Sequence, residues 1–369
     1  MAATQLSDAE RSLWLRLYRS ENVGPIAFRQ LLQRYGTAQE ALDALPDLAK
    51  RGGKRGFKVF AASDAAREIE ALSKFGARLI ALCEPEYPAL LREAEDAPAL
   101  IAVLGHPHIW EKPSVAIVGA RNASFNGLRF AEDLARDLGD AGLCVVSGLA
   151  RGIDTAAHKG SLATGTVAVM AGGVDVCYPP ENKSLYDRIA QAGALISELP
   201  PGVQPQARHF PRRNRIVAGM TLGTVVVEAA LRSGSLITAR LAGEYGREVF
   251  AVPGSPLDPR AKGANDLIRN GATLIETAKD VLDVVLRRSL SEPSKEHEEL
   301  YTNLSYLMDN DIEMARLAVL ERLGPVPTNV DEIVRECQLS APAILAALLE
   351  LELAGHIERY PGNKVAKRA

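Results

Sequence analysis

The sequence is poor in cysteine and aromatic residues and has no long apolar run, and each shortage excludes a class of protein. Only 4 of its 369 residues are cysteines, and they lie too far apart to match the ligand spacing of a zinc site. The 6 histidines are equally scattered, so we expect no metal and no cofactor. No apolar stretch reaches the length of a membrane span and no signal peptide is recognisable, which together indicate a cytoplasmic protein that does not contact membranes.

The sequence also has no large excess of charge of either sign. Its 43 basic and 46 acidic side chains give a formal net charge of −3, so affinity for a nucleic acid would have to come from local clusters. Residues 208–215, RHFPRRNR, hold four arginines and no acid, and apolar residues flank them tightly, which favours a functional role over a solvated face. Residues 50–58, KRGGKRGFK, form a second basic and glycine-rich run.

Residues 115–158 have the pattern of a strand–helix–strand unit in a buried parallel sheet, because two apolar β-branched runs each end in a turn of small residues. The turns GARN at 119–122 and SGLARG at 147–152 place an arginine beside glycine where a helix should begin. A third turn, SGS at 233–235, precedes another helix. Exposed amides, the helix dipole and a guanidinium group favour anions, and phosphate is the anion that we expect.

We predict four segments: a helical domain at 1–75, a central α/β domain at 76–287, a polar linker at 288–314 and a small domain at 315–369. In the central domain apolar strands alternate with helical patterns, as in a doubly wound sheet whose ligands bind at the carboxyl ends of the strands. The predicted strands are residues 79–82, 115–118, 144–147, 167–170, 194–197, 224–228, 248–252 and 273–275.

The usual enzymatic signatures are missing from this sheet. After Gly119 the dinucleotide fingerprint would need glycines where the chain has Arg121 and Ser124, whose side chains would fill the space of a pyrophosphate. No GxxxxGK[ST] loop and no GxSxG elbow is present. The sequence therefore predicts phosphate-binding turns without a nucleotide site and without catalytic residues.

The two ends of the chain each predict a small domain. A break at Val23-Gly24-Pro25 between two helical patterns resembles a helix-hairpin-helix or SAM-type helical domain. Three helical patterns and a hairpin after residue 315 resemble a winged helix, whose third helix, at 341–354, often reads the major groove of DNA. That helix carries Glu350 and Glu352 and no base, so a protein-contact module is favoured over a duplex binder.

Taken together, the motifs resemble the DprA (Smf) family of DNA-processing proteins. VAIVGAR, SGLARGID, Tyr178-Pro179, Ser197-Glu198, FPRRNRIVAG, VVVEA with SGSLITA, GREVFAVPG and GANDLI occur in the order found in that family. The resemblance implies an extended Rossmann-like domain that binds single-stranded DNA, forms a homodimer and has no enzymatic activity. It further implies a recombination mediator that protects incoming strands and loads the RecA recombinase during competence and natural transformation.

The resemblance also assigns residues to roles. At Ala120 the chain departs from the family, which commonly has serine there, and loses a hydroxyl contact. The dimer surface falls near Leu267, Ile268 and Leu274. By motif position the DNA-binding residues are Gly119, Arg121, Ser147, Gly148, Arg151, Gly152, Lys159, Arg212, Arg213, Arg215, Ser233 and Gly234.

Two other functions remain open. Gly223-Thr224 followed by Glu228 resembles the GGxGTxxxE turn of the lysine-decarboxylase-like phosphoribohydrolases, which would make the protein a nucleotide N-glycosidase, although Thr221-Leu222 replaces the paired glycines. The second alternative is a transcription-type protein that reads duplex DNA with its C-terminal domain. For the favoured function, single-strand binding, the low aromatic content predicts that affinity comes mainly from about five phosphate contacts and depends little on sequence. The logarithm of the binding constant should then fall with the logarithm of the salt concentration with a slope of about −3.5.

Overall fold

The computed structural model describes residues 4–289, 309–360 and 362–368, and these form two compact units. The larger unit is Met1–Gln5 with Glu68–Glu292, and the smaller unit is Leu6–Arg67 with Pro293–Ala369. The N-terminal helices and the C-terminal domain, which the sequence treats as separate, thus belong to the same unit. The predicted linker 288–314 lies mostly outside the described residues, and its end, from Asp309, is helical.

The larger unit is built on one nine-stranded sheet in the order β1-β2-β6-β5-β4-β3-β7-β8-β9. The strands from β6 to β9 along this order are parallel, whereas β1 and β2 run antiparallel to their neighbours. β3 to β7 are buried throughout except at Gly119, as expected for a sheet covered on both faces. The strands are β1 Arg78–Ala81, β2 Leu100–Gly105, β3 Ser114–Gly119, β4 Cys144–Ser147, β5 Thr166–Val169, β6 Ala194–Ser197, β7 Gly223–Val227, β8 Glu248–Ala251 and β9 Thr273–Leu274.

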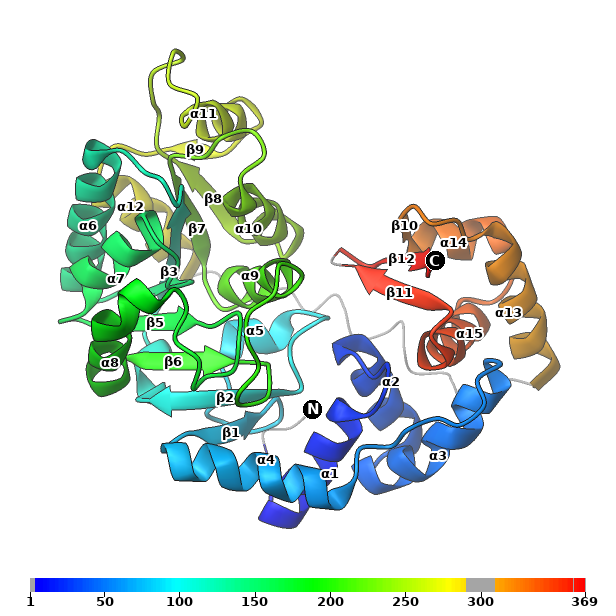
Figure 1. Ribbon diagram of the computed structural model, residues 1–369. Coiled ribbons are helices and arrows are strands. Elements are labelled where there is room, and N and C mark those ends of the chain that lie inside the picture. The colour runs from blue at the N-terminus through cyan, green and yellow to red at the C-terminus, as the bar shows by residue number, and fades with distance from the viewer. Residues whose placement is uncertain (1–3, 290–308, 361, 369) are drawn as a thin grey trace. The chain divides into compact units, whose positions relative to one another are not determined.

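Helices cover both faces of this sheet (Figure 1). On one face the apolar sides of α6, α7 and α12 pack on β3, β4 and β7 in a single core cluster. On the other face α9 packs against α10 through Ala218 and Leu241. The helices are α4 Ala62–Phe75, α5 Ala89–Glu93, α6 Phe125–Asp140, α7 Ile153–Ser161, α8 Lys183–Ala192, α9 His209–Gly219, α10 Gly234–Glu244, α11 Lys262–Arg269 and α12 Ala278–Ser289, with short 3-10 helices η1 Pro107–Glu111 and η2 Pro180–Asn182.

The strand order reverses between β3 and β7. From β3 the chain proceeds through β4 and β5 to β6 in one direction, and it then crosses over to place β7, β8 and β9 on the other side of β3. In open α/β sheets this switch point is where ligands usually bind, at the carboxyl ends of the strands. A ligand site is therefore expected at the carboxyl ends of β3 and β7.

The sequence predicts every parallel strand of this sheet but not β2. Leu100–Gly105 pairs antiparallel with both β1 and β6, which extends the sheet at one edge. The segment before it contains Pro85, Pro88 and Pro98, and proline-rich sequence is typical of irregular structure, so the apolar run that follows is easily overlooked.

The smaller unit joins helices from both ends of the chain. α13, α14 and α15 enclose a core with β11 and β12, the arrangement of a winged helix. The N-terminal helix α3 packs directly against α15. The elements are α1 Asp8–Arg19, α2 Pro25–Tyr35, α3 Ala38–Arg51, α13 Asp309–Arg322, α14 Val330–Cys337, α15 Ala341–Ala354, β10 Thr328–Asn329, β11 Ile357–Tyr360 and β12 Lys364–Lys367.

Candidate nucleic-acid interface

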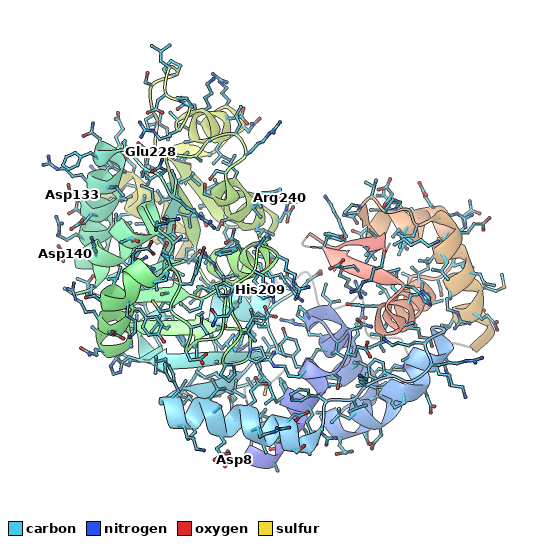
Figure 2. The ribbon with its side chains drawn as sticks, viewed as in Figure 1. Asp8, Asp133, Asp140, His209, Glu228 and Arg240 are labelled. Atoms are coloured by element: carbon cyan, nitrogen blue, oxygen red, sulfur yellow. The ribbon has the colours of Figure 1, made fainter. Side chains whose placement is uncertain are left out.

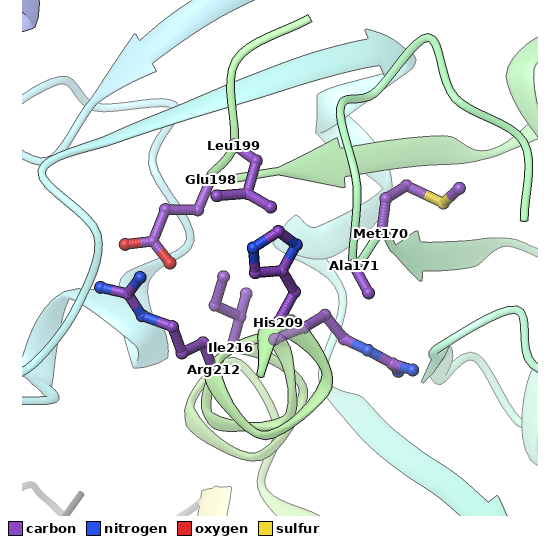
Figure 3. A pocket seen from close by; sticks show the side chains of 8 residues that line it. Met170, Ala171, Glu198, Leu199, His209, Arg212 and Ile216 are labelled. Atoms are coloured by element: carbon purple, nitrogen blue, oxygen red, sulfur yellow. The ribbon is translucent and has the colours of Figure 1, made fainter. Parts of the chain in front are cut away.

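The start of α9 lies at the carboxyl edge of β5 and β6 and lines a shallow pocket (Figure 3). Residues that follow β5 and β6 form the opposite wall. His209 is buried there, and burial together with Arg208 and Arg212 lowers the pKa of its imidazole, which keeps the ring neutral at pH 7. Its Nδ1 accepts a hydrogen bond from the amide of Gln206 at 3.2 Å. The lining residues are Met170, Ala171, Glu198, Leu199, His209, Arg212, Arg213 and Ile216.

Arg213 points into the protein rather than into solvent. It is only 7% exposed, its Nη1 lies 4.0 Å from Oδ2 of Asp154, and its guanidinium group covers Gly148 so closely that a Cβ there would overlap it. Burial raises the pKa of Asp154, while Arg213 and the amides of Ala150 and Gly148 oppose that rise. Gly148, which the sequence assigns to anion binding, is therefore needed for the close packing of Arg213.

In the turn after β4 the backbone amides bind a carboxylate that is part of the chain. Oδ2 of Asp154 accepts hydrogen bonds from the amides of Gly148, at 3.1 Å, and Ala150, at 3.3 Å. Asp154 is 6% exposed, so the carboxylate occupies the place that a phosphate would need. Ser147 is fully buried and donates its hydroxyl to the carbonyl of Ile117 at 2.6 Å. This corrects the expectation that Ser147 and Gly148 contact DNA.

The turn after β3, at the switch point, is filled in the same way. Glu228, labelled in Figure 2, follows β7 in a left-handed conformation. Its carboxylate accepts hydrogen bonds from the amide of Ser124, at 2.8 Å, and from the hydroxyl of the same residue. Ser124 is the N-cap of α6, so the carboxylate lies at the positive end of that helix. Glu228 thus blocks the nucleotide-binding position of the sheet and is itself held as a helix cap.

Other expected contact residues also have internal roles. Arg215 is 5% exposed and donates from Nη2 to Glu198 at 2.6 Å and from Nη1 to the carbonyl of Asp96. Gly119 and Gly152 permit close approach of the backbone turns, since a Cβ on either would overlap a carbonyl oxygen. Gly119 and Gly152 therefore serve close packing, and Arg215 forms a structural ion pair with Glu198 rather than a contact with DNA.

Lys159 is exposed but lies in the last turn of α7, six residues beyond Ile153. At 1.5 Å per residue that places it about 9 Å along the helix axis, away from the carboxyl edge. The structure therefore separates Lys159 from the arginines with which the sequence groups it.

A set of exposed groups does meet at this edge. The guanidinium carbon of Arg121 lies 4.8 Å from the ring centroid of Phe210, and the ring of Tyr178 packs edge-on against Phe210 at 5.9 Å. Arg121 is exposed and Tyr178 is 43% exposed, so a cation and an aromatic face are both presented to solvent. We call Arg121, Phe210 and Tyr178 the stacking cluster. The sequence missed Tyr178 as a contact residue, although the motif Tyr178-Pro179 contained it.

The remaining expected residues are accessible. Arg212 is exposed beside the pocket, and Arg151 has a 65% exposed side chain 3.9 Å from Glu181. The turn at Ser233 and Gly234 opens α10, and the side chain of Asn214 on α9 donates to the carbonyl of Gly234 at 3.2 Å. A Cβ on Gly234 would meet no atom within 4 Å, so the backbone here is not packed against the rest of the protein, unlike that at Gly119 and Gly148 in the other two turns.

The expected dimer residues lie at the end of the sheet. Leu267 and Ile268 are half-buried on α11, and Leu274 is 46% exposed on the edge strand β9. Among the described residues, no group of His, Cys, Asp or Glu side chains comes together in a way that could hold a metal ion. The helices in the described ranges are also too short or too polar to cross a membrane.

Three family models match the chain in succession. DNA recombination-mediator protein A matches residues 78–286, the DprA-like N-terminal HHH domain matches residues 8–71, and the DprA winged helix domain matches residues 311–363. The first of these covers the whole parallel sheet and the stacking cluster. The other two cover the helices of the smaller unit.

Individual relatives agree with these models. The chain is 31% identical to protein Smf of Synechocystis over 98% of its own length and 100% of the relative's. The crystal structure of DprA from Streptococcus pneumoniae matches 76% of this chain and 99% of that one, with 36% identity and a TM-score of 0.66. A Helicobacter pylori DprA structure, described in terms of its single-stranded DNA binding mode, matches 57% of this chain and 96% of that one, with 28% identity and a TM-score of 0.53.

Proposed function

Because this chain belongs to the DprA family of DNA-processing proteins, we propose that its larger unit binds single-stranded DNA at the carboxyl edge of the sheet. The binding has little sequence preference, protects the strand and delivers it to the RecA recombinase during natural transformation. Two copies of the chain act together through the β9 edge near Leu267, Ile268 and Leu274.

The observation that carries this proposal is the stacking cluster. Bases of a single strand bind to aromatic faces and to guanidinium planes whatever their identity, and such stacking contributes about 1–3 kcal/mol per base. Arg121 over Phe210, with Tyr178 beside them, offers both kinds of surface at one point. The Helicobacter pylori relative, whose structure concerns single-stranded DNA binding, supports the same ligand here.

Phosphate contacts come from groups around the stacking cluster. Arg212 and Arg151 are exposed cations, and the start of α10 at Ser233 and Gly234 adds the positive end of a helix dipole. None of these groups distinguishes one base from another, which accounts for the lack of sequence preference.

The internal acids argue against the nucleotide N-glycosidase. That reaction would use Glu228, but its carboxylate caps α6 through Ser124 and is pressed against Gly127, where a Cβ would lie 2.7 Å from the carboxyl carbon. A glutamate held in this way has no free oxygen directed at a substrate. Release of adenine from AMP by the purified protein would contradict this interpretation.

The proposal is tested by fluorescence anisotropy with a labelled oligo-dT. We expect Phe210→Ala and Arg121→Ala each to weaken binding by about 5- to 100-fold, because each removes a stacking plane. Arg136→Ala is the matched control, since Arg136 is a half-exposed arginine on the later part of α6 that pairs with Asp133. Parent-like affinity in both cluster variants, with their folds intact by circular dichroism, would place the strand elsewhere.

A further inference from the structure

The proposed function leaves the basic run at residues 50–58 without a role. It holds five cations and no acid, begins with Lys50 and Arg51 in the last turn of α3, and belongs to the smaller unit. Lys50 and Arg55 are exposed. Gly53 and Gly56 have positive φ, so the loop turns tightly, and its cations are presented by side chains rather than by free amides.

Packing brings this loop to the C-terminal strand of the winged helix. A Cβ on Gly53 would lie 3.2 Å from Nε2 of His356, and the backbone amide of Arg368 donates to the carbonyl of His356 at 2.8 Å. The guanidinium group of Arg368 lies close to Gly355, the neighbour of His356. We call Lys50, Arg55, His356, Lys367 and Arg368, all of them exposed, the composite basic surface.

Two acids near this surface, Glu350 and Glu352, form ion pairs inside the unit. Glu350 is 1% exposed and accepts from Arg316 at 3.1 Å, while Arg316 also donates to the carbonyl of Arg51 at 2.6 Å. Glu352 is buried and pairs with Arg359 at 2.7 Å. Glu21 pairs with Lys54 of the loop at 2.6 Å, and the acids that remain exposed here are Asp47, one turn before Lys50 on α3, and Glu358 on β11. The four lysine and arginine side chains of the composite basic surface therefore outnumber the two exposed acids beside them.

The helix that normally reads bases in a winged helix is not accessible here. α15 is buried along almost its whole length, between its own domain core and α3. Gly52 lies against the backbone of Glu350, and Asn22 donates from Nδ2 to the carbonyl of Leu353 at 3.1 Å. Contact with a nucleic acid at this unit must therefore be with its backbone, not with base edges.

We propose that the composite basic surface binds the phosphate backbone of duplex DNA, as a second site separate from the single-strand site of the larger unit. A duplex is the better partner because it carries one charge per about 1.7 Å and keeps its bases stacked within itself. A single strand would need rings to stack on. Phe57 of the loop is half-buried, and the exposed ring of Tyr360 lies at the far end of β11 from His356.

The test uses the full chain and a blunt 30-base-pair duplex of mixed sequence, with oligo-dT as the second probe. Lys50→Ala with Arg55→Ala removes the loop cations, and Lys367→Ala with Arg368→Ala removes the strand cations. Arg322→Ala with Arg335→Ala is the matched control, because both are exposed arginines of the same unit on α13 and α14. Each variant loses two positive charges.

Each double variant of the composite basic surface is expected to weaken duplex binding on the order of 10- to 30-fold at about 0.15 M salt and to reduce the salt slope by about 2. Its affinity for oligo-dT should stay within about twofold of the parent. The proposal is overturned if the parent does not bind the duplex, if the control loses as much duplex affinity, or if oligo-dT affinity falls in parallel. The single-strand proposal is tested by the loss of oligo-dT binding in Arg121→Ala, a result that does not depend on duplex binding. Either proposal can therefore fail while the other stands.

Discussion

Arg121, Arg213 and Arg215 all belong to motifs that the sequence assigns to DNA binding, yet only Arg121 reaches solvent. Arg213 pairs with Asp154, and Arg215 pairs with Glu198. Less than 10% of each arginine side chain is exposed. The sequence predicted turns suited to anions, and Asp154 fills one of them as Glu228 fills another. What a run of arginines cannot reveal is which acid, distant in the chain, pairs with each member.

His158 gives a prediction that belongs to this scale. It is fully buried, its Nδ1 lies 2.7 Å from the hydroxyl of Thr166, and burial, with Arg213, lowers its pKa from 6.5 to about 3. The unfolded chain takes up a proton as pH falls below about 6.5, whereas the folded chain does not until about pH 3. His158 therefore costs stability progressively across that range, about 2–3 kcal/mol by pH 4.5.

The variant His158→Gln removes this titration. Between pH 7 and pH 4.5 the larger unit of the variant should lose about 2–3 kcal/mol less unfolding free energy than that of the parent. Urea unfolding monitored by circular dichroism at both pH values measures the difference in unfolding free energy. Equal losses in parent and variant would mean that the imidazole is protonated in the folded protein.

At the scale of elements, the sequence located strands and helices well and their partners poorly. β3, β4 and β7 were predicted to within a residue, because β-branched runs bounded by small residues have few alternatives. β11 and β12 and the span of α15 were also predicted. The packing of α3 on α15 was not, because each helix has an apolar side that would fit many surfaces and the two lie almost 290 residues apart.

Gly52 tests the contact between α3 and α15. A Cβ on Gly52 would overlap the carbonyl oxygen of Glu350 and lie 2.8 Å from Cβ of Ala354, and its φ of −68° imposes no strain of its own. Gly52→Ala should therefore destabilise the smaller unit by about 1–3 kcal/mol through overpacking. Gly324→Ala is the control, since its nearest neighbour would be 4.0 Å away. Similar melting temperatures for the two variants would show that α3 and α15 separate easily.

At the scale of the whole molecule, the structure changes the expected salt dependence of single-strand binding. The sequence predicted about five phosphate contacts and a slope near −3.5, but Arg213 and Arg215 are internal and Lys159 lies apart. With Arg121 stacked on a base, Arg151 and Arg212 leave about two phosphate contacts and a slope of about −1.4, at roughly −0.7 for each. Raising salt from about 50 to 200 mM should then weaken oligo-dT binding about sevenfold. A measured slope steeper than about −2 would require cations beyond these two.

The pairing of α3 with α15 also has a consequence for how the protein is made. A ribosome adds about 5–20 residues per second, so roughly 15 to 60 seconds pass between the emergence of α3 and that of its partner. Throughout that interval α3 can pack on α1 and α2 but not on α15, while the entire parallel sheet is synthesised and can complete its own core. α3 therefore gains one of its native neighbours only after the sheet has been made, and a chaperone that shields the side facing α15 would act on every copy of the nascent chain.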